Sequence, residues 1–223
     1  GISTVSLAHA SAAAAGIISG GHTITGEAGA FTVNIGKSLA GNDSTLGNTL
    51  TISDGADNTT TTDALTVNNT GINSTTGKNI ILTNNITSTG YENVTFNTGA
   101  GSGNTEQTMA TFTVTADAAT AATTLTITGS NAVDVTTAVS ANSTAGITVD
   151  GSGLTVQAAG VTTMDLDTVA AGTGATITIV GSGGDDIFGT SSAATNATLA
   201  TTVNSGAGAD AIYTGTGADT ING

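Results

Sequence analysis

The 223-residue chain sets 16 acidic residues against two lysines, contains no arginine, cysteine or proline, and has a formal net charge of −14. So few cations cannot neutralise phosphate groups, which excludes nucleic acid as a partner and argues equally against adsorption to an anionic membrane. Aromatic residues make up only 3 % of the chain, so a large globular core is hard to build. An all-β solenoid avoids this difficulty, because its narrow core is filled by small and β-branched side chains. No stretch approaches the ~20 apolar residues of a membrane-spanning helix, so direct membrane insertion is not expected.

The N-terminal region, residues 1–100, is predicted to consist of short β-strands. From His22 onward apolar and polar residues alternate, which is typical of half-buried strands. The turn Ser53–Asn58 contains Asp54 and Asp57, which could hold an ion, although a solvated turn is the favoured interpretation. The segments predicted as strands are Thr23–Thr25, Phe31–Ile35, Thr49–Ile52, Ala64–Val67, Asn79–Leu82 and Gly90–Phe96.

A glycine-rich link, Gly99–Asn104, is the predicted boundary with a second region, residues 101–180, although it could also be a long turn of one continuous solenoid. In this second region, strand-like segments recur in two interleaved series, each at an offset of about 21 residues. The recurrence predicts a β-solenoid with two strands in each coil. A β-sandwich has similar strand spacing and is the alternative fold. The two series are Phe112–Val114, Val133–Val135 and Leu154–Val156, and Leu125–Ile127 and Ile147–Val149.

The third region, residues 181–223, contains a glycine-rich repeat of nine residues. Asp210 and Asp219 lie nine positions apart, and each follows Gly-x-Gly-x and precedes x-Ile. An irregular third copy begins at Gly181, and its register is ambiguous because either Asp185 or Asp186 can occupy the aspartate position. The spacing from Asp186 to Asp210 is not a multiple of nine. We therefore expect an insertion to bulge from the roll there, or the roll to restart.

A repeat of this kind predicts a parallel β-roll that binds calcium. Ca²⁺ takes about six to eight oxygen ligands in a flexible cage. Glycines reach backbone angles closed to other residues, so their carbonyl groups can point at an ion, while the aspartate supplies charge. Each repeat is expected to form half a coil, with ions between turns stacked on one edge. The predicted calcium-binding residues are Gly181, Gly183, Gly184, Asp185, Asp186, Gly206, Gly208, Asp210, Gly215, Gly217 and Asp219.

The repeats Gly206–Ile212 and Gly215–Ile221 resemble the repeat-in-toxin (RTX) nonapeptides of calcium-binding proteins exported by type I secretion. Over the whole chain, the Thr-, Ala-, Gly- and Asn-rich composition resembles that of RTX-type surface-layer proteins of Gram-negative bacteria. The segment Gly90–Phe96 is similar to the Gly-x-Glu-x-(apolar)-(Thr/Asn)-(apolar) strands that are frequent in those proteins. The resemblance implies a secreted cell-surface protein that folds on meeting calcium and assembles with copies of itself. Because family rolls often carry many tandem repeats and this chain has two regular ones, each ion is expected to depend on a neighbouring turn.

The favoured function is a structural subunit of an extracellular surface layer, a lattice stabilised by calcium. Its expected partners are other copies of the chain, and cell-surface polysaccharide is a further partner class. The alternative is a binding module, either a calcium-dependent adhesin stalk or filament subunit, or an ice-binding face of stacked Thr-x-Thr segments such as Thr49–Thr51 and Thr124–Thr128. An enzyme is not expected, because the chain has no His-Glu-x-x-His motif and no arginine to face an acidic substrate.

Overall fold

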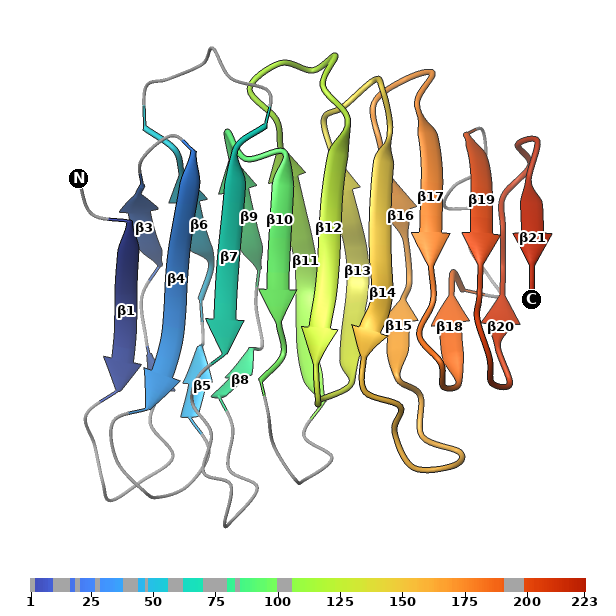
Figure 1. Cartoon of the computed structure of the whole chain (residues 1–223), viewed down its shortest axis with the longest axis horizontal. Helices are drawn as coiled ribbons and strands as arrows, with labels where there is room; N and C mark the ends of the chain where they lie inside the picture. The colour runs from blue at the N-terminus through green and yellow to red at the C-terminus, as the bar shows by residue number, and fades with distance from the viewer. Residues whose placement is uncertain are drawn as a thin grey trace.

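The chain folds as a β-solenoid whose coils stack along one long axis, as seen in a computed structural model (Figure 1). The structure describes residues 3–9, 17–18, 21–26, 29–37, 44–46, 48–55, 62–69, 80–82, 85–99, 106–190 and 199–223. Strand β1 lies at one end of the axis and β21 at the other, and the strand pairs along the stack are parallel. This finding confirms the predicted all-β solenoid and overturns the sandwich alternative, because sandwiches are built from antiparallel sheets.

Two nine-stranded parallel sheets form the walls of the solenoid, and their strands run in opposite directions (Figure 1). The first sheet contains β1 (Thr4–His9), β4 (Ala30–Lys37), β7 (Ala64–Asn69), β10 (Asn93–Asn97), β12 (Thr123–Gly129), β14 (Ile147–Leu154), β17 (Thr176–Val180), β19 (Ala200–Asn204) and β21 (Thr220–Asn222). The second contains β3 (His22–Thr25), β6 (Leu50–Ser53), β9 (Ile86–Thr89), β11 (Gln107–Thr115), β13 (Val133–Ala141), β15 (Met164–Leu166), β16 (Val169–Ala170), β18 (Asp186–Phe188) and β20 (Ala211–Ile212). A short third sheet joins β2 (Ile17–Ile18), β5 (Ser44–Leu46) and β8 (Ile80–Leu82).

Alternating sequence builds each wall, because successive side chains of a strand point to opposite faces. Inward positions carry Val, Ile, Leu and Phe, which form one continuous buried column. The aromatic rings of Phe96 and Phe112 meet across this column, with centroids 5.8 Å apart at an angle of 57°. A column of this width needs few aromatic residues, which agrees with the composition.

Coil length varies, although the register between neighbouring strands is kept. Thr202 pairs with Thr220 near the C-terminal end of the solenoid, whereas Leu50 pairs with Ile86 across a coil that is twice as long. The stacked strands therefore need no constant spacing in the sequence. Register also aligns threonines into rows on both outer faces, with Thr51, Thr87 and Thr113 on the second sheet, and Thr66, Thr95 and Thr126 on the first.

The coil length predicted for the second region is wrong. Phe112 pairs with Val139 and not with Val133, and Leu154 belongs to the first sheet while Phe112 belongs to the second. Ile147 pairs with Thr123 and not with Leu125, so the second series is also shifted. Register shifts between β11 and β13 and between β12 and β14 cause part of the error, since β13 and β14 each have one extra residue at the shift.

Both sheets continue across the boundaries expected at residues 100/101 and 180/181. Strand β10 pairs with β12 and β9 pairs with β11, so the walls pass the glycine-rich link without interruption. At the second boundary β17 pairs with β19 and β15 pairs with β18. The three sequence regions therefore share the same two sheets.

Candidate functional site

The first two glycine-rich turns stack in register at the corner where the chain passes from the first sheet to the second. The turn from Gly181 to Asp185 precedes β18, and the turn from Ser205 to Asp210 precedes β20. Gly206 and Gly208 have φ angles of +92° and +131°, and a Cβ at either position would overlap the carbonyl oxygen of Ser182 or Gly184 in the turn below. Only glycine fits both the backbone angle and this close approach.

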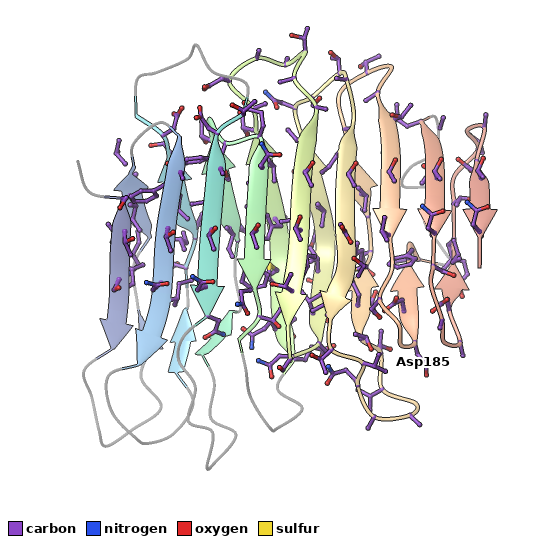
Figure 2. All side chains as sticks on the ribbon, viewed as in Figure 1. Asp185 is labelled. Atoms are coloured by element: carbon purple, nitrogen blue, oxygen red, sulfur yellow. The ribbon has the colours of Figure 1, made fainter. Side chains whose placement is uncertain are left out.

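Aspartates connect the two stacked turns through backbone hydrogen bonds. Oδ1 of Asp210 accepts the N–H of Asp186 at 3.1 Å, and Oδ1 of Asp185 accepts the N–H of Ala209 at 2.9 Å. Asp185 lies at the tip of its turn (Figure 2) and is half-buried. The sequence therefore brings together Asp185, Asp186 and Asp210 at one edge of the solenoid.

Asp186 resolves the ambiguous register of the first repeat, because it aligns with Asp210 and is fully buried. Its carboxylate accepts three hydrogen bonds, from the N–H of Met164 at 3.0 Å, the N–H of Ser182 at 2.7 Å and the Ser182 hydroxyl at 2.8 Å. Burial raises the pKa of Asp186, and the hydrogen bonds from Ser182 act in the opposite direction. The carboxylate thus fastens its own turn to the preceding coil.

The third repeat turns at the opposite corner, before β21. Oδ1 of Asp219 accepts the N–H of Thr201, which lies 18 residues earlier, at 3.1 Å. This spacing equals two repeats, so each repeat forms half of this last coil, as the sequence predicted. Gly215 and Gly217 belong to this corner, while Gly181, Gly183 and Gly184 belong to the other. The predicted residues therefore occupy two edges and do not form one cage.

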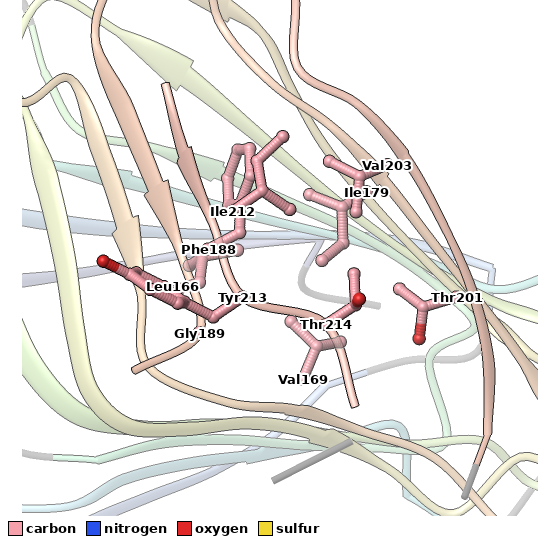
Figure 3. A pocket seen from close by; sticks show the side chains of 10 residues that line it. All are labelled: Leu166, Val169, Ile179, Phe188, Gly189, Thr201, Val203, Ile212, Tyr213 and Thr214. Atoms are coloured by element: carbon pink, nitrogen blue, oxygen red, sulfur yellow. The ribbon is translucent and has the colours of Figure 1, made fainter. Parts of the chain in front are cut away.

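The interior between these two corners is almost filled. Figure 3 shows side chains of both sheets around an apolar pocket whose cavity volume is about 10 Å³. That space holds about one water molecule. It is far below the roughly 300–1,000 Å³ of a ligand pocket. The residues that line it are Leu166, Val169, Ile179, Phe188, Gly189, Thr201, Val203, Ile212, Tyr213 and Thr214.

A second acidic group lies at the corner where the chain returns from the second sheet to the first, here called the return corner (residues 54–55, 62–63, 90–92 and 116–122). Across the described residues, one set of three carboxylates places an oxygen from each within 4.8 Å of the others: Asp54, Asp63 and Asp117. The solvated turn favoured for Asp54 is wrong, because Asp54 is 5 % exposed. Asp57 lies outside the described residues.

Glu92 lies on the coil between the two coils that supply these aspartates and connects them. Its Oε2 accepts the N–H of Asp63, and its Oε1 accepts the N–H of Asp117, both at 3.1 Å. Glu92 is 1 % exposed. A buried carboxylate that accepts backbone N–H groups from two neighbouring coils fixes their relative positions.

Electrostatics at the return corner is dominated by carboxylates. The pKa of Asp54 is raised to about 6, chiefly by burial. The carboxyl of Asp117 contributes to this rise through its charge and through a hydrogen bond that only a protonated carboxyl can make. The charge of Asp63 acts in the same direction. Tyr91 lies close by. Burial and the charges of Asp54 and Asp63 raise the pKa of its phenol.

Sequence reasoning missed Asp63, Glu92 and Asp117 as members of one site. Each stands next to a strand end, but they are separated by loops and coils of unequal length. The sequence offers one signal, the segment Gly90-Tyr-Glu92, and its pattern does not by itself indicate an acidic site.

Comparison of the chain with protein-family models, curated proteins and solved structures gave no significant match. A helix of the length and apolarity that a membrane span requires does not occur within the part of the chain that the structure describes.

Proposed function

We propose that the chain is a structural subunit of a bacterial surface layer, secreted to the cell surface and assembled with its own copies into a lattice stabilised by Ca²⁺. The observation that carries the proposal is the pair of glycine turns stacked in register, with Gly206 above Ser182 and Gly208 above Gly184. Stacked turns of this kind direct backbone carbonyls and aspartates to one edge of a solenoid. This is the oxygen-rich environment that Ca²⁺ prefers.

The charge of the chain supports the same function. With 16 acidic residues and two lysines, the protein requires counter-ions, and divalent cations from the medium are suited to bridge acidic surfaces. Extracellular calcium modules bind with dissociation constants of about 0.1–1 mM. An incomplete cage at a solenoid edge suits binding in this range, because a neighbouring turn or subunit can supply the remaining ligands. Cell-surface polysaccharide is a further partner under this proposal.

Electron microscopy of the purified chain in EDTA and in Ca²⁺, at concentrations around the expected affinity of roughly 1 mM, tests the proposal. We expect a two-dimensional sheet in Ca²⁺ that disperses in EDTA and reforms when Ca²⁺ is restored. The double variant Asp210→Asn and Asp219→Asn should need a higher Ca²⁺ concentration for assembly. The variant Asp150→Asn, on the outer face of β14, is the matched control.

Two outcomes would contradict the proposal. One is assembly and a melting temperature that do not change on chelation. The other is a dispersed monomer under every Ca²⁺ concentration. Fibres in place of sheets would instead support the filament or adhesin-stalk alternative, which rests on the same stacked turns.

A further inference from the structure

The return corner carries its acidic residues on three successive coils. Asp54 follows β6 and Asp63 precedes β7, so both belong to one turn. Glu92 precedes β10 in the next coil, and Asp117 follows β11 in the coil after that. The set is thus assembled by stacking and not by a local motif.

Asp54 supplies an observation independent of the clustering. Its side chain is buried, with an exposure of 5 %, and its Oδ2 atom has no hydrogen-bond donor as a partner. A buried carboxylate oxygen without a donor or a cation is costly, because burial removes its water. The carboxyl group of Asp54 faces Asp63 and Asp117, since one oxygen from each of the three lies within 4.8 Å of the others.

The backbone makes room for this arrangement at Gly90. Gly90 has a φ of +86°, and a Cβ at this position would overlap the carboxyl group of Asp54. The side chain of Asp54 therefore lies across the bare backbone of the next coil on its way towards Asp117. Glu92, two residues later, holds the N–H groups of both Asp63 and Asp117 and so sets the spacing of the other two carboxylates.

The donor type indicates the class of ion, and the spacing of the oxygens must be compatible with it. Ca²⁺ binds oxygen at about 2.3–2.6 Å, so ligand oxygens around it lie up to about 4.6–5.2 Å apart. Mg²⁺ binds at about 2.0–2.1 Å, which limits the separation to about 4.2 Å. The three oxygens lie within 4.8 Å of one another, which is compatible with Ca²⁺ coordination. Three carboxylates offer up to six oxygens, and hard oxygen donors without nitrogen or sulfur favour Ca²⁺ over transition metals.

We propose that the return corner is a buried cation site, in which Asp54, Asp63 and Asp117 bind one Ca²⁺ and Glu92 is a positioning residue that holds the turns around it. The ion ties the turn before β7 to the turn before β12, two coils away, and neutralises carboxylates that otherwise repel one another. This site lies outside the nonapeptide turns and stands or falls independently of the proposed lattice.

Luminescence of Tb³⁺, which replaces Ca²⁺ at oxygen sites, can test the proposal because tyrosine sensitises the ion only at short range. The chain has two tyrosines and no tryptophan. Tyr91 lies beside the proposed site, whereas Tyr213 lies shortly after Asp210 in the nonapeptide region. Emission at the return corner should therefore persist in Tyr213→Phe and fall several-fold in Tyr91→Phe. Added Ca²⁺ should displace it.

Carboxylate variants give a second, independent measurement. Asp54→Asn and Asp117→Asn should each weaken the Tyr91-sensitised binding at least tenfold, and Glu92→Gln should weaken it less, while Asp150→Asn should leave it unchanged. In EDTA, Asp54→Asn should melt at or above the temperature of the natural protein, because it removes a repelling charge. Its melting temperature should no longer rise with Ca²⁺.

The proposal is overturned if emission depends on Tyr213 alone, or if Asp54→Asn and Asp117→Asn bind Tb³⁺ as the natural protein does. Either result would identify the group as carboxyls that share a proton. If one variant does not fold, the comparison of the two tyrosine variants still decides the question, because it leaves the three carboxylates intact. Loss of assembly in Asp210→Asn with Asp219→Asn, without loss of the Tyr91 signal, would separate this site from the proposed lattice sites.

Discussion

The two acidic corners of the solenoid use their carboxylates in different ways. In the nonapeptide turns, Asp186 accepts three hydrogen bonds from Met164 and Ser182 and is fully satisfied in the absence of any ion. At the return corner, Glu92 has a comparable role, but Asp54 is buried with an oxygen that has no donor. The aspartates that match the sequence motif thus accept hydrogen bonds from the backbone, while Asp54, which belongs to no motif, has a buried oxygen without a donor.

This difference shows that an acidic residue in a solenoid has two separate uses. A carboxylate that accepts N–H groups of an adjacent coil replaces the hydrogen bonds that a strand would make there. Backbone N–H groups next to the end of a strand therefore keep an acceptor. A carboxylate that faces other carboxylates is repelled by their negative charges, and a bound cation or a proton reduces this repulsion. Asp186 and Glu92 are of the first kind, and Asp54 is of the second.

Removal of the Asp186 side chain should have the largest effect. Asp186→Ala leaves the N–H groups of Met164 and Ser182 buried without a partner, which should lower the free energy of unfolding by about 3–4 kcal/mol. Urea unfolding in EDTA and in Ca²⁺ should give the same loss, because the hydrogen bonds do not need the ion. A loss seen only in Ca²⁺ would show that Asp186 is chiefly an ion ligand and would break the comparison.

A methyl group at Gly90 should have an intermediate effect. Gly90→Ala places a Cβ against the carboxyl of Asp54 at a φ of +86°. Gly174→Ala is the matched control, because Gly174 has a φ of +81° and no atom within 4 Å of such a Cβ. The control should lose about 1–2 kcal/mol from its left-handed backbone, and Gly90→Ala should lose about 1–3 kcal/mol more from overlap. Equal losses in thermal unfolding would mean that Asp54 moves aside freely.

The smallest expected effect concerns pH at a third acidic group, on the outer face of the second sheet. The pKa of Asp134 and of Asp165 is raised from 3.8 to about 6, chiefly by burial. The charges of Glu106 and Asp167 contribute to both shifts, and the charge of Asp134 contributes to that of Asp165. The folded chain therefore binds these protons more tightly than the unfolded chain does. Their contribution to stability should be fully present below pH 3.8 and should be lost as the pH rises through 6.

Melting temperatures between pH 4 and pH 8 check this dependence, in EDTA and in Ca²⁺. The double variant Asp134→Asn and Asp165→Asn should flatten the curve by a few degrees relative to the natural protein. The difference between the two proteins should be the same with and without Ca²⁺, since this pair is not part of the three-carboxylate set at the return corner. A difference that Ca²⁺ abolishes would add this group to the ion-binding corners.

Much of the fold could be predicted because the pattern is local. Alternation in segments such as Phe31–Ile35 identifies strands, and scarce aromatics with abundant Thr and Gly exclude a sandwich-like core. Register could not be predicted in the same way. Val133 pairs with Gln107, and a bulge between Met109 and Thr111 shifts the rest of that strand pair, so sequence spacing alone misplaces the coils.

The two candidate sites also differ in how far the sequence could predict them. The half-coil length of the repeats was predictable because the last coil is two repeats long, with Asp219 accepting the N–H of Thr201, 18 residues earlier. The stacking of Asp186 with Asp210, 24 residues apart, does not follow the nine-residue period. Asp54 and Asp117 meet only because two intervening coils have particular lengths, which are set by corner loops with no periodicity. The sequence could not show that Asp54 is buried, because its burial depends on coils that are distant in the sequence.

The parallel stacking has a mechanical consequence for a chain held at both ends. Strand hydrogen bonds run along the long axis, so an axial pull separates coils one at a time and does not shear whole sheets. Neighbouring strands lie about 4.8 Å apart, yet a single released coil can extend to roughly 60–120 Å, depending on its length. Each coil can thus add a large length to the chain once its hydrogen bonds break. An ion that bridges two coils would raise the force needed to separate them.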